Sequence, residues 1–129
     1  MKVPRFWRSF PSRYNLVGTK CKSCSTPYFP PRKICPKCRR GGAMEEFQFA
    51  GNGKVLTWTA VHQAPAGWER QAPYTLAIVQ LDEGPKLTTQ LVGLENEPEA
   101  GMKVKAVFRK MAEEGPEGVI YYGYKFAPA

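Results

Sequence analysis

From residue 44 onward, apolar and polar residues alternate along much of the chain. In the segment 101–110, for example, Val104, Ala106 and Phe108 fall on one face, and Lys103, Lys105 and Arg109 fall on the other. A period of two predicts a strand with one buried face. Similar segments, separated by turn residues, cover residues 44–50, 54–63, 73–84, 86–94 and 119–128.

Five to six short strands joined by one longer connection, Ala64 to Ala72, suit a small closed barrel of the OB type. Closure also removes the unpaired edges that a single sheet of this size would leave. The composition changes after Gly41-Gly42. We therefore expect a mostly β protein with an N-terminal short helix and metal-binding ribbon over residues 1–42, followed by a five-stranded OB-fold barrel over residues 43–129.

The first residues carry aromatic side chains at helical spacing. Phe6, Trp7 and Phe10 are compatible with one face of a short helix over residues 3–10, ended by Pro11. These aromatics either pack on the ribbon or form a docking arm for a partner. Residues 13–20 then resemble a strand that leads into the first cysteine pair.

All four cysteines lie between residues 21 and 38, as two Cys-x-x-Cys pairs. Each pair brings two sulfurs to one point, and two pairs complete a tetrahedron around a metal, as in a rubredoxin-like zinc ribbon. Two disulfides are the alternative, but paired motifs of this kind in an intracellular chain usually bind metal. Zinc is favoured over iron, because no other feature indicates electron transfer. The expected structural ligands are Cys21, Cys24, Cys35 and Cys38.

Charge is distributed unevenly. The net charge is +8, yet residues 1–40 hold 11 Lys and Arg and no Asp or Glu, so the remainder is net −3. A basic region of this kind attracts RNA, an acidic protein surface or a phosphate-bearing ligand. No apolar run approaches the roughly 20 residues of a membrane span, and the N-terminus lacks an apolar signal-peptide core. A soluble, cytoplasmic protein is expected.

Catalytic chemistry is not indicated. His62 is the one histidine and has no nucleophile arranged beside it, and the acidic residues 95–99 and 113–117 resemble solvated turns. No phosphate-binding glycine motif is present. The loop 64–74 is of more interest, since its prolines stiffen a segment that presents aromatic and guanidinium groups to a ligand or partner.

Four segments in this order, RYNLVGTKCKSC, YFPPRKICPKC, APYTLAIVQLDEG and YYGYKFAP, resemble the acyl-CoA-associated zinc-ribbon/OB-fold family catalogued as domain of unknown function thirty-five. The resemblance spans about Arg5 to Pro128. One departure is that Ser25 and Arg39 follow the second cysteine of each pair, where such ribbons often have glycine. A non-glycine residue at positive φ costs of order 1 kcal/mol.

The resemblance implies a small non-catalytic subunit beside thiolase-fold enzymes. A short archaeal member with all four cysteines is similar to the subunit that bridges acetoacetyl-CoA thiolase and hydroxymethylglutaryl-CoA synthase in the mevalonate pathway. The expected partners are those two enzymes in a hetero-oligomeric complex, with zinc as the metal and coenzyme A as a candidate ligand. The residues expected to contact CoA or a partner are Arg32, Lys33, Trp68, Arg70 and Tyr74.

Two other functions stay open. OB barrels bind single-stranded nucleic acid, but such grooves are usually basic and the barrel region here is net negative. A rubredoxin-like electron carrier is the third interpretation, and it would require iron in place of zinc.

Overall fold

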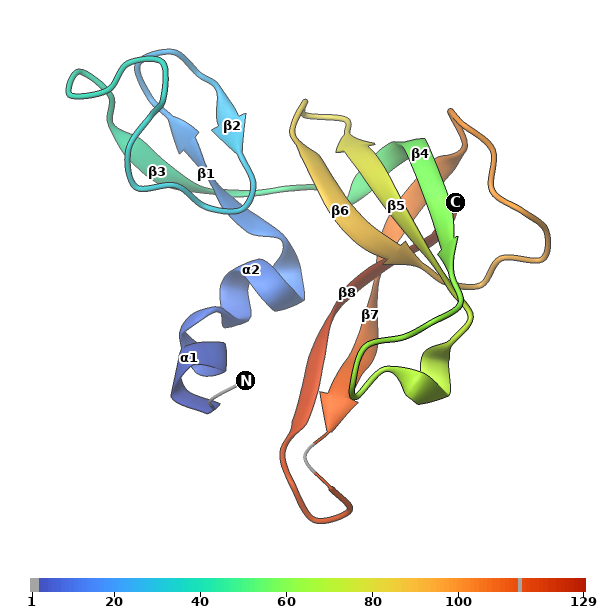
Figure 1. Cartoon of the computed structure of the whole chain (residues 1–129). Coiled ribbons are helices and arrows are strands. Elements are labelled where there is room, and N and C mark those ends of the chain that lie inside the picture. The colour runs from blue at the N-terminus through green and yellow to red at the C-terminus, as the bar shows by residue number, and fades with distance from the viewer. Residues whose placement is uncertain (1–2, 114) are drawn as a thin grey trace.

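The computed structural model describes residues 3–113 and 115–129. Two short helices, a small three-stranded sheet and a closed barrel follow one another along the chain (Figure 1). The protein is mostly β with a five-stranded barrel, as the alternation predicts. The elements are α1 (Val3–Arg8), α2 (Phe10–Asn15), β1 (Val17–Cys21), β2 (Pro27–Tyr28), β3 (Met44–Gln48), β4 (Asn52–Val61), the 3-10 helix η1 (Glu69–Gln71), β5 (Tyr74–Leu81), β6 (Lys86–Leu91), β7 (Lys103–Glu113) and β8 (Ile120–Pro128).

Two helices rather than one begin the described chain. The expectation of a helix ended by Pro11 is wrong, because Pro11 lies in the first turn of α2. There its missing N–H leaves no helical hydrogen bond unmade. The strand expected over residues 13–20 consequently starts only at Val17, after Leu16 ends α2 in a left-handed conformation with φ 53°.

The ribbon is built on a three-stranded antiparallel sheet in the order β2-β1-β3. β3 pairs with β1 along its whole length, from Val17 opposite Gln48 to Cys21 opposite Met44. Residues 44–48 therefore form a strand as expected, but that strand belongs to the sheet of the ribbon. The division of the chain into domains at residue 42 stays a prediction.

The barrel strands follow the order β4-β5-β6-β8-β7, and β7 returns to pair with β4. Neighbours are antiparallel except β6 and β8, which run parallel where Leu91 lies opposite Phe126. There the amide of Val92 donates to the carbonyl of Phe126 at 2.8 Å. This contact closes the sheet, so that neither β6 nor β8 is left as an open edge.

A β-bulge between Val55 and Thr57 changes which residues of β4 face inward. Val55 is buried before it, the inserted residue Leu56 is half-buried, and so is Trp58 after it. Because a bulge inserts one extra residue, it shifts the alternation from odd to even positions. Alternation in the segment 54–63 predicts one face for Leu56, Trp58 and Ala60; the first two are half-buried, whereas Ala60 is exposed.

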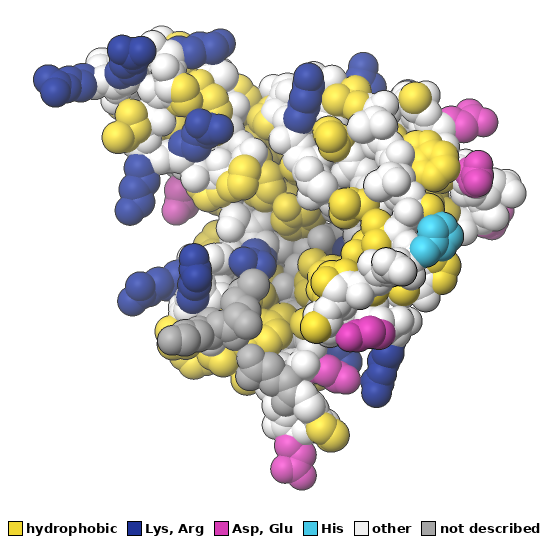
Figure 2. All heavy atoms as spheres, viewed as in Figure 1, with side chains coloured by type: hydrophobic (Ala, Val, Ile, Leu, Met, Phe, Trp, Pro, Cys, Tyr) yellow, Lys and Arg dark blue, Asp and Glu magenta, His cyan; other side chains and the backbone are white. Residues whose placement is uncertain are grey.

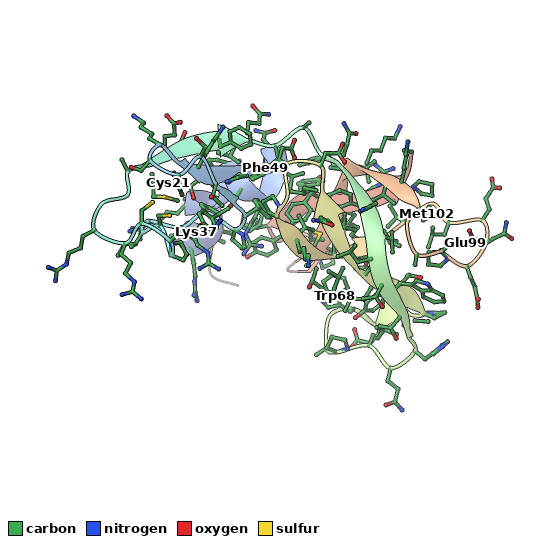
Figure 3. The ribbon with its side chains drawn as sticks, turned by 90° about the horizontal axis from the view of Figure 1, so that it is seen from above. Cys21, Lys37, Phe49, Trp68, Glu99 and Met102 are labelled. Carbon is green, nitrogen blue, oxygen red and sulfur yellow. The ribbon has the colours of Figure 1, made fainter. Side chains whose placement is uncertain are left out.

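Both the helices and the ribbon pack against β8. Phe6 of α1 is only 2% exposed and meets the ring of Tyr121 edge-on at 4.7 Å. Phe29, just after β2, meets Tyr124 at 5.7 Å. Seen from above, Phe49 on the link between β3 and β4 lies between the ribbon and the barrel (Figure 3). Of the two interpretations of the N-terminal aromatics, packing is correct for Phe6, although its partner is the barrel rather than the ribbon.

The surface separates the two signs of charge. Lys and Arg side chains gather on the side of the ribbon and helices, and most Asp and Glu side chains on this face lie over the barrel side (Figure 2). This matches the sequence, in which residues 1–40 carry no acidic side chain. Within the described part of the chain, no helix is long and apolar enough to cross a membrane.

Replacing Phe6 and Trp7 separately tests the packing of the helices. Phe6→Ala removes a buried ring from the contact with β8, so we expect a loss of about 3 kcal/mol in the free energy of unfolding. Trp7 is 57% exposed, and Trp7→Ala should change stability by no more than about 0.5 kcal/mol. Urea denaturation followed by circular dichroism measures both. Equal effects of the two changes would contradict this packing.

Candidate functional site

Two matching turns bring the four cysteines together. The amide of Ser25 donates to the carbonyl of Cys21, and that of Arg39 donates to the carbonyl of Cys35, both at 2.8 Å. Ser25 and Arg39 adopt φ of 57° and 51°, in the left-handed region where such ribbons often use glycine. The departure noted in the sequence therefore leaves the turn geometry intact, at a local cost of order 1 kcal/mol per residue.

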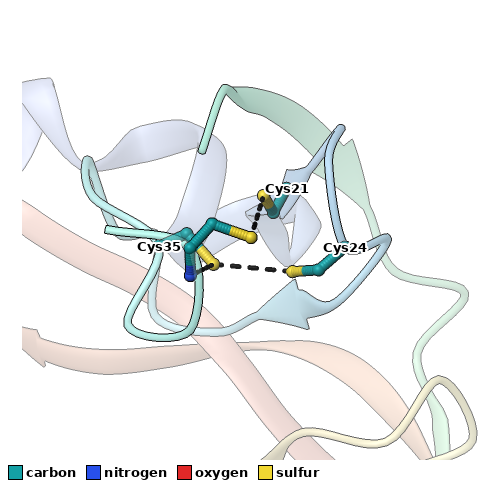
Figure 4. Close-up of side chains that lie close together, drawn as sticks. Cys21, Cys24 and Cys35 are labelled. Carbon is teal, nitrogen blue, oxygen red and sulfur yellow. Dashed lines mark hydrogen bonds between the residues drawn. The ribbon is translucent and has the colours of Figure 1, made fainter. Parts of the chain in front are cut away.

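The four sulfur atoms all lie within 4.8 Å of one another. The Sγ atoms of Cys24 and Cys35 are 3.5 Å apart, and those of Cys21 and Cys38 are 3.9 Å apart (Figure 4). A tetrahedron with metal–sulfur bonds of about 2.3 Å has edges of about 3.8 Å. All four are free cysteines, so they form a set positioned to bind a metal ion rather than two disulfides.

The cluster lowers the pKa of one cysteine, Cys35, and raises the pKa of another, Cys38. The amide of Cys38 donates to Sγ of Cys35 at 3.4 Å, and this bond, with the hydroxyl of Tyr28 as a further donor, lowers the pKa of Cys35 to about 6. The pKa of Cys38 is raised to about 12, first by its hydrogen bond with Cys24 and then by burial. Four thiolates therefore need a cation at their centre to coexist.

Tyr28 closes one side of the cluster. Its hydroxyl lies 3.6 Å from Sγ of Cys35, and that hydrogen bond to the sulfur raises the pKa of Tyr28 to about 12. The tyrosine thus stays protonated and is available as a donor to the sulfur. Because four cysteines complete a tetrahedral coordination shell, a metal held here has no open position for water or substrate. The arrangement supports structure rather than chemistry.

A cleft of about 720 Å³ lies between α2, the segment 29–31 and the barrel. Its walls are mostly apolar or aromatic, and no Asp or Glu is among the described residues that line it. Trp68 and Tyr74 both line the cleft, with ring centroids 5.5 Å apart. Cavities of this volume are typical of small-molecule sites.

Lys125 places a positive charge in the wall of this cleft. The residue is 5% exposed, and its Nζ donates to Oε1 of Gln71 at 2.8 Å and lies 5.8 Å from the centroid of the Trp68 ring. Burial, followed by the nearby charge of Arg109, lowers the pKa of Lys125. Sequence reasoning missed this residue. The available signal was a lysine two positions after Gly123, in a strand whose alternate residues 121, 123 and 125 are buried.

The other residues expected to contact CoA or a partner do not gather in this cleft. The side chain of Arg70 is 94% exposed and pairs with Glu113 at 3.8 Å. Arg32 lies over the ring of Tyr28 at 5.5 Å and lines a separate pocket of about 380 Å³. Lys33 is exposed on the ribbon. Their contact roles stay predictions, and the structure brings only Trp68 and Tyr74 of the five side by side.

The single histidine lies outside both the cysteine cluster and the lining of the cleft. His62 is exposed just after β4. Across residues 3–113 and 115–129, the four cysteines form the one group of at least three metal-ligating side chains close enough to hold an ion.

Two adjacent glycines offer a matched test of the metal site. A Cβ atom at Gly42 would lie 2.9 Å from Cβ of Cys35 and 3.1 Å from Cβ of Cys38, whereas at Gly41 the nearest atom would be 3.5 Å away. Gly42→Ala should therefore displace the cysteine turns and cost about 1–3 kcal/mol. Gly41→Ala should change stability by no more than about 0.5 kcal/mol.

Metal content by mass spectrometry and loss of metal to a chelator measure the effect, with Cys21→Ser as the reference that lacks a ligand. Gly42→Ala should lose metal faster than the wild type, and Gly41→Ala should match it. Indistinguishable alanine variants would mean that the cysteines do not sit as described.

Two family models match successive parts of the chain. The model described as "ChsH2, rubredoxin-like zinc ribbon domain" matches residues 8–45, and "ChsH2, C-terminal OB-fold domain" matches residues 47–109. Among solved structures, the chain is similar to "Ltp2-ChsH2(DUF35) aldolase", with a TM-score of 0.72 and 31% identity, over 97% of this chain and 92% of that one.

Curated relatives extend the match over the full length. A "DUF35 domain-containing scaffold protein" of Methanocaldococcus jannaschii is 52% identical over 98% of this chain and 90% of its own length. One from Pyrococcus furiosus is 49% identical over 99% and 93%. A "Probable enoyl-CoA hydratase alpha subunit" of Thermomonospora curvata is 34% identical over 77% of this chain, but only 31% of that protein is matched. The resemblance seen in the sequence is confirmed, and the chain belongs to the DUF35 family, with a ChsH2-type zinc ribbon and OB-fold domain.

Proposed function

We propose that this protein is a non-catalytic scaffold subunit of an acyl-CoA enzyme complex. The observation that carries the proposal is the full-length match to relatives named scaffold proteins, in which nearly all of both chains align. The neighbour named as an aldolase with a DUF35 component adds support, because its name pairs this fold with an enzyme. A coordinatively closed metal site fits the same role, since it offers no position for a substrate.

The metal of the ribbon is zinc in this proposal. Cys21, Cys24, Cys35 and Cys38 would hold it as four thiolates, and the sulfur spacing fits zinc–sulfur bonds. Zinc supplies folding free energy at such a site and no redox chemistry. If the site held iron, as the electron-carrier interpretation requires, a preparation from cells grown with iron would be coloured.

The partners in this proposal are an acetoacetyl-CoA thiolase and a hydroxymethylglutaryl-CoA synthase. This part rests on the family resemblance, and the relative named as a hydratase subunit supports a link to acyl-CoA chemistry. Formation of acetoacetyl-CoA by the thiolase is uphill, so direct transfer of that product to the second enzyme pulls the reaction forward. A bridging subunit holds the two active sites close enough for that transfer.

The cleft beside Trp68 and Tyr74 is the proposed contact for CoA. Its apolar walls suit the pantetheine arm, and Arg13 and Lys125 supply positive charge within the same lining. Sites for small molecules generally combine such walls with a few placed polar groups. Arg32 and Lys33 lie outside this cleft and are better suited to contact a protein.

Reconstitution tests the scaffold role. The purified protein is mixed with the thiolase and the synthase of its own organism, and the product is analysed by size-exclusion chromatography with light scattering. We expect a three-component complex of fixed stoichiometry, and we expect the thiolase and the synthase to associate less, or not at all, when the scaffold is omitted. A scaffold that elutes alone in the presence of both enzymes would exclude the bridging function.

The CoA contact has a matched pair of variants in one loop. Trp68→Ala removes an aromatic wall of the cleft, and we expect roughly tenfold weaker CoA binding by isothermal titration calorimetry. Arg70 lies two residues away, but its side chain is exposed and pairs with Glu113. The Arg70→Ala variant should therefore bind CoA as tightly as the wild type does. If the wild-type protein does not bind CoA, the proposed CoA contact is wrong, whereas the scaffold role is unaffected.

A further inference from the structure

We propose that the outer loop of the ribbon is a docking surface for an acidic protein surface that contains an apolar pocket. The surface consists of Lys33, Ile34, Lys37, Arg39 and Arg40, which we call the ribbon tip. The proposal rests on the scaffold function and deepens it, because it names the part of this chain that a partner enzyme contacts and the chemistry of the contacted surface.

The cations of the ribbon tip are exposed and uncompensated. All four are exposed, and none of them makes an ion pair within residues 3–113 and 115–129. Lys22 on the same ribbon differs, since it lies 3.8 Å from Glu45, and Arg32 is turned onto the ring of Tyr28. The tip remains net positive when the two negative charges of a tetrathiolate zinc site are subtracted.

The charge of the tip is set apart from the acidic part of the molecule. Lys37 and Glu99 lie toward opposite ends when the protein is seen from above (Figure 3). A separation of this kind orients an approaching acidic surface toward the ribbon and raises the association rate. It also disfavours docking of the same surface on the barrel.

Ile34, which follows Lys33 in the chain, supplies an apolar anchor within the ribbon tip. Its side chain is 69% exposed, although the next residue, Cys35, is buried in the metal cluster. The turn hydrogen bond between Arg39 and Cys35 fixes the backbone on the other side. A large apolar group on a backbone that is already ordered loses little entropy when it is buried by a partner, which is how interface anchors contribute affinity.

The composition of the tip favours protein over nucleic acid. Residues 30–42 contain no aromatic side chain, whereas proteins that hold single strands stack the bases on aromatic rings. Phosphates would satisfy the cations but leave Ile34 in water. An acidic protein surface with an apolar pocket would satisfy both.

Charge reversal at two places in the chain tests the proposal. The tip variant is Lys33→Glu/Lys37→Glu, and the control is Lys103→Glu/Lys105→Glu on β7, where both lysines are also exposed. The two variants have the same net charge.

A second pair of variants tests the apolar anchor. It compares Ile34→Ser with Ile78→Ser, since Ile78 is another exposed isoleucine. Each tagged protein, checked for full metal content, is expressed in its native cells, and recovered partners are quantified by mass spectrometry with and without nuclease.

We expect the tip variants to recover at least about tenfold less partner than the wild type, and the β7 and Ile78 controls to recover normal amounts. If the wild type recovers a different protein in place of the thiolase and synthase, and the tip variants lose it while the controls keep it, the docking surface is supported and the two proposed partners are excluded. Unchanged recovery of both enzymes by the tip variants would overturn the docking surface and leave the scaffold function in place. Nuclease-sensitive recovery would overturn it in favour of RNA, and no partner for the wild type would overturn both proposals.

Discussion

The convergence of four cysteine sulfurs on one point is the constraint on which the rest of the structure depends. The ribbon has three short strands, one of them only two residues long, and units of this size rarely bury enough apolar surface to fold alone. The cysteine turns compensate, because a metal that binds the folded form alone adds its binding free energy to folding. The chain between the turns carries Phe29 onto Tyr124 of β8. A metal bound by these cysteines would therefore also help to order one wall of the cleft, to which Phe29 belongs.

Strand β8 contacts three other parts of the structure. Tyr121 receives Phe6 of α1, Phe126 closes the barrel against β6, and Lys125 faces the cleft. The last contact ties the loop that follows β4 to the barrel through polar groups, because Gln71 accepts from Lys125 and donates to the carbonyl of Met111 at 3.4 Å. Trp68 is held in the cleft by this network and by its contact with Tyr74.

Local patterns predicted the parts of the protein that depend on local physics. The cysteine spacing indicated the metal cluster, and the period-two segments indicated the strands of the barrel. Pro11 was misread because proline ends a helix at one position and begins one at another, and the sequence alone does not say which applies. The pairing of β3 with β1 and the bulge in β4 arise from contacts between distant segments. The same holds for the burial of Lys125 and for the outward turn of Arg70 toward Glu113, since each depends on a partner more than 40 residues away.

The proposed scaffold function requires surfaces that do not exchange partners, and differences in chemistry provide that selectivity. The ribbon tip is exposed and basic, with one exposed isoleucine, whereas the cleft is mainly apolar, with Lys125 buried in its wall. An acidic surface suited to the first would lose its hydration in the second without enough charge to replace it. The segment between Cys24 and Cys35 joins the two, since it contributes Phe29 and Pro30 to the cleft and leads directly into the tip. A metal held by the four cysteines would order this segment, and would thereby help to fix the placement of the ribbon tip relative to the cleft.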